Sequence, residues 1–233
     1  METIGNLLAN QKKNPLVSSQ LPLAGKSIQQ QWSNEKINAY WKREFVASIK
    51  SVSPSFTVDD SNRLLLNAIY RWMWKMTGTL DVTKGILLHG PIGVGKSTLL
   101  KGMQHYAAKV ARYCICDKNT CDTFQFISAA EIALQFAEKG ITCLNRYTDR
   151  GCMHHLAIDE VGREPMESKY FGTGINVIQT VLQLRYEQRY DFYTHITTNL
   201  DPNTEFSSYY ESYVTDRVKE MFNVIKMEGK SRR

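Results

Sequence analysis

The stretch that most constrains this chain fits the pattern G-x-x-x-x-G-K-[ST] at every position. It consists of Gly90, Pro91, Ile92, Gly93, Val94, Gly95, Lys96 and Ser97. Residues 85–89 before it form a short apolar run, and residues 97–113 after it carry apolar side chains at spacings of three and four. The sequence therefore predicts a buried strand, a glycine-rich turn and a helix in succession. This is the context that a phosphate-binding loop requires.

The expected chemistry of the loop follows from its backbone. Glycines allow successive N–H groups to point into one concavity, and the following helix adds the positive end of its dipole. We expect residues 90–98, which end at Thr98, to hold the phosphates of a nucleotide. Lys96 would reach the β- and γ-phosphates, and Ser97 would place its hydroxyl on Mg²⁺. The alternative is a chance glycine-rich turn, which the flanking strand and helix disfavour.

Composition sets wider limits. The chain has 233 residues, of which 42% are hydrophobic and 22% charged, as in ordinary globular proteins. It has neither an apolar run long enough to cross a membrane nor the pattern of a secretory signal at its start, so we expect a cytoplasmic protein without a membrane partner. The net charge of +6 permits nucleic-acid binding without demonstrating it.

The cysteines argue against a disulfide framework, because an odd number occurs in a chain without secretory features. They are Cys114, Cys116, Cys121, Cys143 and Cys152. A zinc site is conceivable, since three of them lie close together and Cys152 is near two histidines. The spacing is not that of a paired C-x₂-C motif, so we favour reduced structural thiols.

The order of predicted elements indicates an α/β fold. The first thirty or so residues are polar and read as partly disordered. Helical spacing follows over residues 32–49 and again from about residue 60. Predicted strands then alternate with predicted helices: strands 85–89, 123–127, 154–161 and 192–198, and helices 97–113, 128–140, 175–190 and 210–222. This alternation predicts a three-layer fold with a mostly parallel sheet.

Polar residues at the ends of two predicted strands are candidates for nucleotide chemistry. Asp159 and Glu160 follow the apolar residues 156–158. Asp159 would hold Mg²⁺, and Glu160 would orient the attacking water. Thr198 and Asn199 end the next strand and could hydrogen-bond the γ-phosphate or that water. The alternatives are a charged strand end for the acidic pair and a turn cap for Asn199.

These motifs, in this order, are similar to those of the AAA+ ATPases, and within them to the DnaC/IstB-like group of helicase loaders and transposition helpers. Residues 216–225, followed by Gly229-Lys230-Ser231-Arg232-Arg233, resemble the end of proteins in that group. So do residues 177–187, which precede the Thr-Thr-Asn strand. The resemblance covers about residues 55–233. It implies an AAA+ ATPase domain over this range and a partner-binding segment over residues 1–54.

The resemblance also implies roles for individual residues. Lys96 and Ser97 belong to Walker A, Asp159 and Glu160 to Walker B, and Asn199 resembles sensor 1. Arg217 matches the arginine finger, which completes the site of a neighbouring subunit, and so implies a homo-oligomer. We place Arg217 at the border of a helix face formed by Val214, Val218, Met221 and Ile225. The alternative is an ordinary surface arginine. Residues 200–233 are too few for a full helical lid domain.

Partner contacts are less sharply indicated. Arg146, Tyr147, Arg150 and Phe136 mix basic and aromatic groups and could bind single-stranded DNA, the strand form we favour, or could form a loop beside the core. Trp32, Tyr40, Trp41 and Phe45 could form a helix that docks on a helicase or recombinase, or could equally pack on the ATPase core.

We therefore expect a protein that binds and hydrolyses ATP with Mg²⁺ and loads or remodels a replicative helicase on DNA. The nearest alternative is an IstB-like transposition helper that acts with a transposase on duplex DNA. A small-molecule phosphotransferase and a nucleotide-gated adaptor with negligible hydrolysis are more distant alternatives. The acidic pair, the Thr-Thr-Asn strand and Arg217 disfavour the phosphotransferase.

Overall fold

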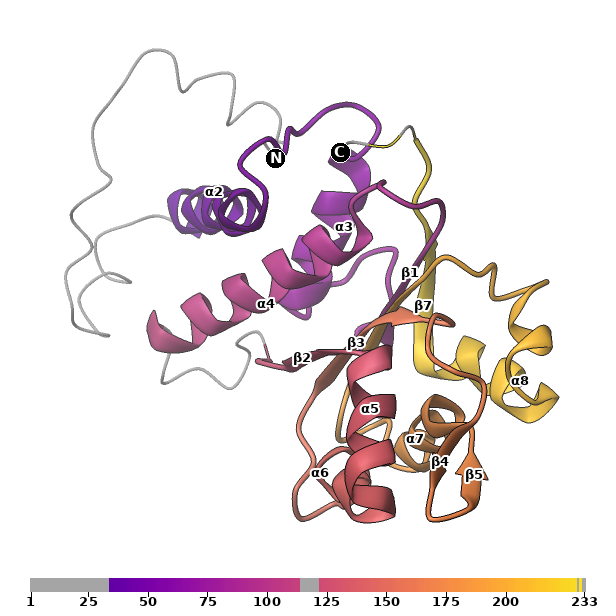
Figure 1. The fold of residues 1–233 in the computed structure, drawn as a ribbon. Helices are drawn as coiled ribbons and strands as arrows, with labels where there is room; N and C mark the ends of the chain where they lie inside the picture. The colour runs from indigo at the N-terminus through magenta and orange to yellow at the C-terminus, as the bar shows by residue number, and fades with distance from the viewer. Residues whose placement is uncertain (1–33, 114–121, 230, 232–233) are drawn as a thin grey trace. The chain divides into compact units, whose positions relative to one another are not determined.

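A computed structural model describes residues 34–113, 122–229 and 231 (Figure 1). The chain divides into two compact units: unit 1 comprises residues 1–82 and 101–123, and unit 2 comprises residues 83–100 and 124–233. Among the described residues, no helix combines the length and apolar character that crossing a membrane requires. The assignment of residues 1–54 to partner binding stays a prediction.

Unit 1 is built from α2 (Asn34–Val52), α3 (Arg63–Met73) and the later part of α4 (Lys96–Tyr113). Its centre is aromatic. Trp41 and Phe45 of α2 are buried, and the Phe45 ring lies 5.2 Å from the ring of Tyr106 on α4 and 6.0 Å from that of Tyr70 on α3. Of the two alternatives, Trp41 and Phe45 therefore pack inside the molecule and are not available to a partner. Trp32 lies outside the described residues.

Unit 2 is organised around a sheet of five strands. They are β1 (Gly85–His89), β2 (Gln125–Ser128), β3 (Leu156–Val161), β6 (Thr194–Thr198) and β7 (Phe222–Lys226). Their order is β2-β3-β6-β1-β7, and every neighbouring pair is parallel. The α/β fold with a parallel sheet is therefore confirmed. Because all strands run the same way, their carboxyl ends meet at one edge.

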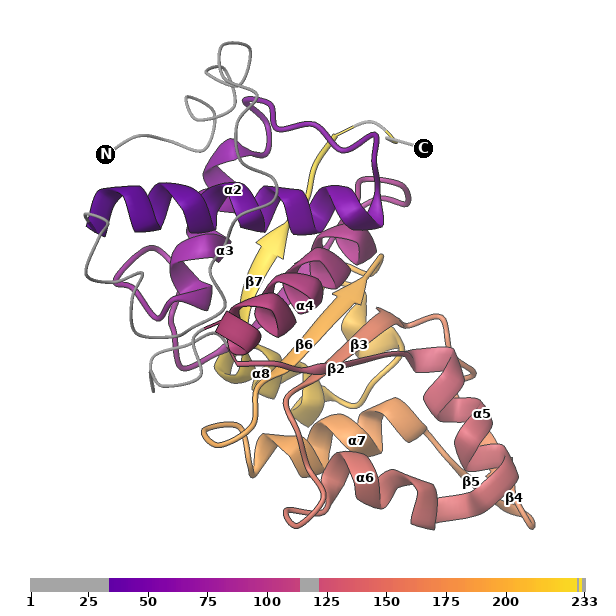
Figure 2. The ribbon, with the colours of Figure 1, turned by 90° about the vertical axis from the view of Figure 1, so that its left-hand side faces the viewer.

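Four helices of unit 2 share one hydrophobic core with the sheet (Figure 2). They are α5 (Ala129–Lys139), α6 (Asn145–Thr148), α7 (Val177–Tyr186) and α8 (Ser212–Met221), with short 3₁₀ segments at Gly140–Leu144 and Phe206–Ser208. Ser128 caps α5, since its side chain accepts a hydrogen bond from the N–H of Glu131.

The end of the chain differs from its prediction. The expected helix 210–222 ends at Met221, and Phe222 already has the extended backbone of β7, which pairs with β1. Ile225 therefore belongs to a strand and not to the helix face predicted with Val214, Val218 and Met221. Apolar spacing alone could not separate these two elements, and pairing along the sheet edge decides the structure of the segment.

The region before β6 also differs. The strand expected from residue 154 begins at Leu156. The helix expected over 175–190 spans only Val177–Tyr186. Its start is set by Asn176, whose side chain accepts the N–H of Gln179 and caps the helix. A hairpin of β4 (Ser168–Tyr170) and β5 (Thr173–Ile175) precedes it. Strands of this length leave too few residues for a period-two pattern to be read from the sequence.

Two buried basic side chains connect the amino-terminal ends of the strands. Arg185 is fully buried and donates to Thr194 Oγ1 (2.7 Å), to the carbonyl of Tyr147 (2.6 Å) and to carbonyls that precede β3 and β6. Burial lowers its pKa to about 10. His195 Nδ1 accepts the N–H of Ile86, and burial lowers the pKa of this imidazole to about 3. His195 is therefore neutral in the folded protein.

Candidate functional site

The predicted site residues gather at the carboxyl edge of the sheet in unit 2. The phosphate-binding loop follows β1, the acidic pair lies near the carboxyl end of β3, and Asn199 follows β6. β6 lies between β1 and β3 in the sheet, so the three strand ends are neighbours. Residues far apart in the sequence are brought together here by parallel pairing.

The loop has the backbone that its glycines predict. Gly90, Gly93 and Gly95 all have positive φ, at 138°, 87° and 99°. A β-carbon built on Gly95 would meet no atom within 4 Å, so open space lies beside the loop at this position. α4 begins directly afterwards at Lys96, so its positive end adjoins that space. The loop can therefore receive an anionic group.

Lys96 links the loop to β6. Its ammonium nitrogen donates to the carbonyls of Gly90 (2.7 Å) and Pro91 (2.8 Å) and to Asn199 Oδ1 (2.8 Å). Lys96 is 7% exposed. These contacts place the predicted Walker A cation and the predicted sensor next to each other, which is the arrangement required for both to touch one phosphate.

Ser97 and Asp159 fit a magnesium ion. Ser97 Oγ donates to Asp159 Oδ1 at 2.7 Å, and Asp159 is 8% exposed. Mg²⁺ prefers hard oxygen ligands and commonly uses one or two protein groups together with substrate phosphates. No group of three or more His, Cys, Asp or Glu residues that could hold a metal occurs in the described part of the chain. Cys114, Cys116 and Cys121 lie outside that part.

Thr197 is a member of the site that the sequence did not single out. It is 1% exposed, its hydroxyl donates to Asp159 Oδ1 (2.5 Å), and it accepts the N–H of Glu160 (2.9 Å). One hydroxyl thereby fixes the carboxylate of Asp159 and the backbone of Glu160. Thr198, which the sequence suggested, instead donates to the carbonyl of Val161 and accepts the N–H of Leu200.

Glu160 adopts an unusual backbone. Its φ is +58°, in the left-handed region that costs a non-glycine residue energy, and the register of β3 shifts between Ile158 and Val161. The conformation coincides with this register shift near the end of β3. The Glu160 side chain is half-exposed, and its Oε1 pairs with Arg163 at 2.7 Å. Strained residues of this kind cluster at functional sites.

The turn after Glu160 is held by a buried carboxylate. Glu164 is 6% exposed and accepts the N–H of Gly162 (2.8 Å) and the hydroxyl of Tyr210 (2.5 Å). Burial and the adjacent Glu164 raise the pKa of Tyr210, so this phenol stays protonated and donates. These contacts fix the direction in which the chain leaves β3. Nothing in the spacing of the sequence signals them.

Arg217 packs elsewhere in unit 2. Its guanidinium lies over the ring of Tyr186 on α7, at 4.3 Å from the centroid, and 5.6 Å from that of Tyr213. Arg189 lies 4.0 Å from the same Tyr186 ring, whose hydroxyl donates to Glu220 (2.7 Å). Arg217 is thus held by stacking on aromatic rings of α7 and α8. Its predicted role toward a second subunit stays a prediction.

Two of the four predicted DNA contacts are wrong. Phe136 is 3% exposed within the core of unit 2, and Tyr147 is 2% exposed with its hydroxyl donating to Gln135. Phe136 continues the inward face of α5, so neither ring can stack on a base. Arg146 and Arg150 are exposed, and Arg150 pairs with Asp191 at 2.6 Å.

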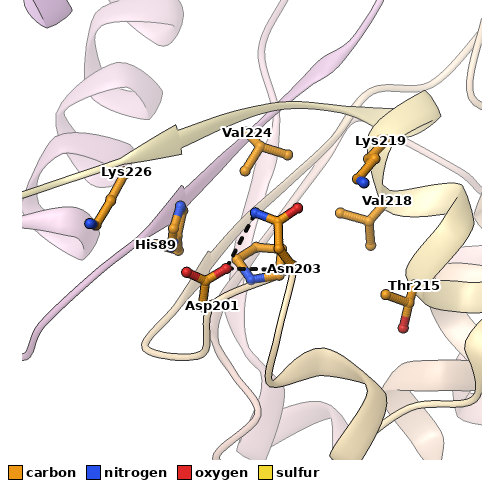
Figure 3. A pocket seen from close by; sticks show the side chains of 9 residues that line it. His89, Asp201, Asn203, Thr215, Val218, Lys219, Val224 and Lys226 are labelled. Atoms are coloured by element: carbon orange, nitrogen blue, oxygen red, sulfur yellow. Dashed lines mark hydrogen bonds between the residues drawn. The ribbon is translucent and has the colours of Figure 1, made fainter.

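A separate pocket of about 380 Å³ opens where β1, β7 and α8 come together (Figure 3). Its lining includes His89, Asp201, Lys219 and Lys226, and none of the predicted nucleotide-site residues. His89 directly precedes the loop residue Gly90, and burial lowers the pKa of its imidazole. The pocket is therefore adjacent to the loop in sequence but distinct from it in composition.

Comparisons with known proteins find similarity in structure only. No protein-family model matches the sequence, and no curated protein is significantly similar to it. A crystal structure of DnaI is 18% identical, with a TM-score of 0.56 over 82% of this chain and 93% of that one. A DnaC helicase loader is 17% identical, with a TM-score of 0.53 over 76% of this chain and 96% of that one.

A third similar structure is AMPPCP-bound DnaA from Aquifex aeolicus. It is 16% identical, with a TM-score of 0.50 over 74% of this chain and 48% of that one. At such identities the likeness concerns the fold. This chain therefore has the fold shared by DnaI, the DnaC helicase loader and the matched part of DnaA.

Proposed function

We propose that this chain is an AAA+ ATPase that binds and hydrolyses ATP and acts in DNA replication by loading or remodelling a replicative helicase on single-stranded DNA. The observation that supports the ATPase most strongly is the hydrogen-bonded group at the sheet edge. These hydrogen bonds join Lys96 to Asn199 and Ser97 to Asp159. Lys96 and Ser97 lie where the glycine-rich loop enters α4. Each group is of the type that phosphoryl transfer from a nucleotide uses.

The hydrogen-bond donors and acceptors of the site suggest a role for each residue. Loop N–H groups and Lys96 would bind the phosphates, and Asn199, 2.8 Å from the lysine, would contact the transferred phosphoryl group or the water. Ser97 and Asp159 would hold Mg²⁺, which when bound neutralises charge developing on the phosphates. Thr197 keeps Asp159 oriented toward the serine.

Glu160 would orient the attacking water and accept its proton. One of its oxygens is occupied by Arg163 in this structure. The partners are 43% and 49% exposed, and such exposed pairs contribute little, on the order of 0 to 1 kcal/mol. The pair can therefore open at small cost when a substrate is bound. If Glu160→Gln hydrolyses ATP at the wild-type rate, the role assigned to this residue is wrong.

Arg217 would complete the site of a second copy, which makes the active species a homo-oligomer. The test mixes two inactive variants, Lys96→Ala and Arg217→Ala. In a mixed assembly, an intact loop from the Arg217→Ala subunit meets an intact arginine from the Lys96→Ala subunit, so activity should return. The stacking contact with Tyr186, which holds the guanidinium in a fixed position, supports this role. If mixing restores nothing while the variants still assemble, Arg217 does not act in trans.

The replication role rests on the likeness to DnaI and the DnaC helicase loader together with the sequence resemblance. Co-purification of the full chain with a hexameric replicative helicase, dependent on ATP, tests it directly. A mobility assay with single-stranded and duplex DNA belongs beside it, with Arg146→Ala as the variant expected to weaken single-strand binding. Filaments on duplex DNA and capture of a transposase instead of a helicase would contradict helicase loading.

A further inference from the structure

The chain segment that follows β7 continues along the phosphate-binding loop. β7 pairs in parallel with β1 up to His89 and Lys226, whose side chains lie at neighbouring strand ends in Figure 3. The pairing extends one step further, because the N–H of Met227 donates to the carbonyl of His89 at 2.7 Å. This bond brings Met227 to the residue from which the loop departs.

The first loop glycine is packed against this segment. A β-carbon on Gly90 would lie 2.2 Å from the carbonyl oxygen of Met227. Backbone atoms cannot yield as a flexible side chain can, so a side chain at this position would force the loop and β7 apart. Position 90 therefore requires glycine for two reasons: the close approach of Met227 and the positive φ of 138°.

The second loop glycine is packed against the same segment further along. A β-carbon on Gly93 would lie 2.3 Å from Ser231 Oγ and 2.9 Å from Ser231 Cβ. Gly95 differs, since a β-carbon there meets no atom within 4 Å. Two of the three loop glycines therefore contact the end of the chain, whereas the third faces the open space beside the loop.

We propose that Met227, Glu228, Gly229 and Ser231, here called the strap, form part of the nucleotide site by holding the phosphate-binding loop in its binding conformation. This inference rests on the proposed nucleotide binding and adds that the affinity for nucleotide depends on the strap. Glycines have the greatest backbone freedom and no side chain to anchor them, so ordering them on binding weakens affinity. The strap supplies the missing packing from outside the loop.

Removal of residues 228–233 tests the inference. Met227 remains, so β7 and its last hydrogen bond are kept, while the contact at Gly93 is lost. The affinity for a fluorescent ADP analogue should fall about tenfold, since ordering a few loop residues costs affinity of that order. Circular dichroism should be unchanged. If the truncated chain binds the analogue as tightly as the full chain does, the strap does not support the loop.

A pair of glycine variants separates contact from backbone strain. Gly93→Ala and Gly95→Ala both place alanine at positive φ, but only the first meets the strap. The loss of affinity caused by Gly93→Ala should be about tenfold smaller in the truncated chain than in the full chain. The loss caused by Gly95→Ala should be the same in both. Equal losses for Gly93→Ala in the two backgrounds would overturn the inference.

Thermal unfolding without nucleotide gives an independent measurement of the same contact. Gly93→Ala should lower the melting temperature more in the full chain than in the truncated chain, and Gly95→Ala should lower it equally in both. A full chain that binds no nucleotide analogue refutes the proposed function, whereas the melting temperatures still decide whether the strap contacts the loop. Equal shifts for Gly93→Ala would show that it does not.

Discussion

Replacing Thr197 with valine removes one hydroxyl and almost nothing else. In the wild-type protein that hydroxyl donates to the carboxylate of Asp159 and accepts the N–H of Glu160. Valine has nearly the same shape, so the core of the sheet should stay filled. The substitution therefore tests whether Thr197 orients Asp159, assigned to Mg²⁺, and Glu160, assigned to the attacking water.

The expected magnitudes come from the two lost bonds. A hydrogen bond to a charged group contributes about 1.5 to 3 kcal/mol and a neutral one about 1 kcal/mol. Thr197→Val should therefore lower the free energy of unfolding by roughly 2 to 4 kcal/mol. Partners of a metal ligand typically influence affinity or activity by about 10- to 100-fold, which is the loss of ATPase rate we expect.

Thr198 provides a matched control on the same strand. It is equally buried and also makes two bonds, but both go to neutral backbone groups. Thr198→Val should cost about 2 kcal/mol of stability and leave the Mg²⁺ dependence of hydrolysis unchanged.

Phosphate release measured across a magnesium titration, with urea unfolding alongside, distinguishes the two variants. If Thr197→Val retains the wild-type rate and the wild-type Mg²⁺ dependence, the bond to Asp159 does not serve the site.

Three further expectations concern buried or stacked side chains. His195 is neutral in the folded protein, where its pKa is about 3 against an ordinary 6.5. The stability that it contributes is therefore full above pH 6.5 and falls below that pH. Urea unfolding should show a loss of about 1.3 kcal/mol between pH 7 and 5.5, and this loss should be absent in His195→Asn. Arg185→Met leaves buried carbonyls without donors and should lower the free energy of unfolding by about 3 kcal/mol or more, whereas the partly exposed Arg189→Met should cost under about 1 kcal/mol. Tyr186→Leu should reduce the ATPase rate of the assembled protein as Arg217→Ala does. Tyr186→Phe keeps the ring and should retain the wild-type rate. Equal rates in the two Tyr186 variants would contradict the stacking role.

The nucleotide loop could be predicted because its motif dictates both backbone and neighbours. Glycines at fixed positions, a strand before and a helix after leave one arrangement, and β1 and α4 appear where expected. That the loop lies beside Asp159 and Asn199 could also be expected, since parallel strands place their carboxyl ends at one edge. Local patterns and a general rule of topology sufficed for these residues.

What escaped prediction depends on contacts between distant residues. β7 continues the apolar spacing of α8, so only its pairing with β1 reveals a strand. Phe136 was a candidate for stacking on DNA because its partners in the core come from other elements of the chain and give no local signal. Thr197 differs from Thr198 only in which neighbour its hydroxyl meets across the sheet. A single sequence carries no local signal for such choices.

The central claim is that Glu160 activates water at a nucleotide site formed by the phosphate-binding loop and β3. The most direct measurement is phosphate release by wild-type protein and by Glu160→Gln under saturating ATP, with the affinity for ATP measured in parallel. We predict unchanged affinity and a rate reduced by at least about 100-fold, the lower range for removal of a general base. Equal rates in the two proteins, or no ATP binding by either, would contradict the claim.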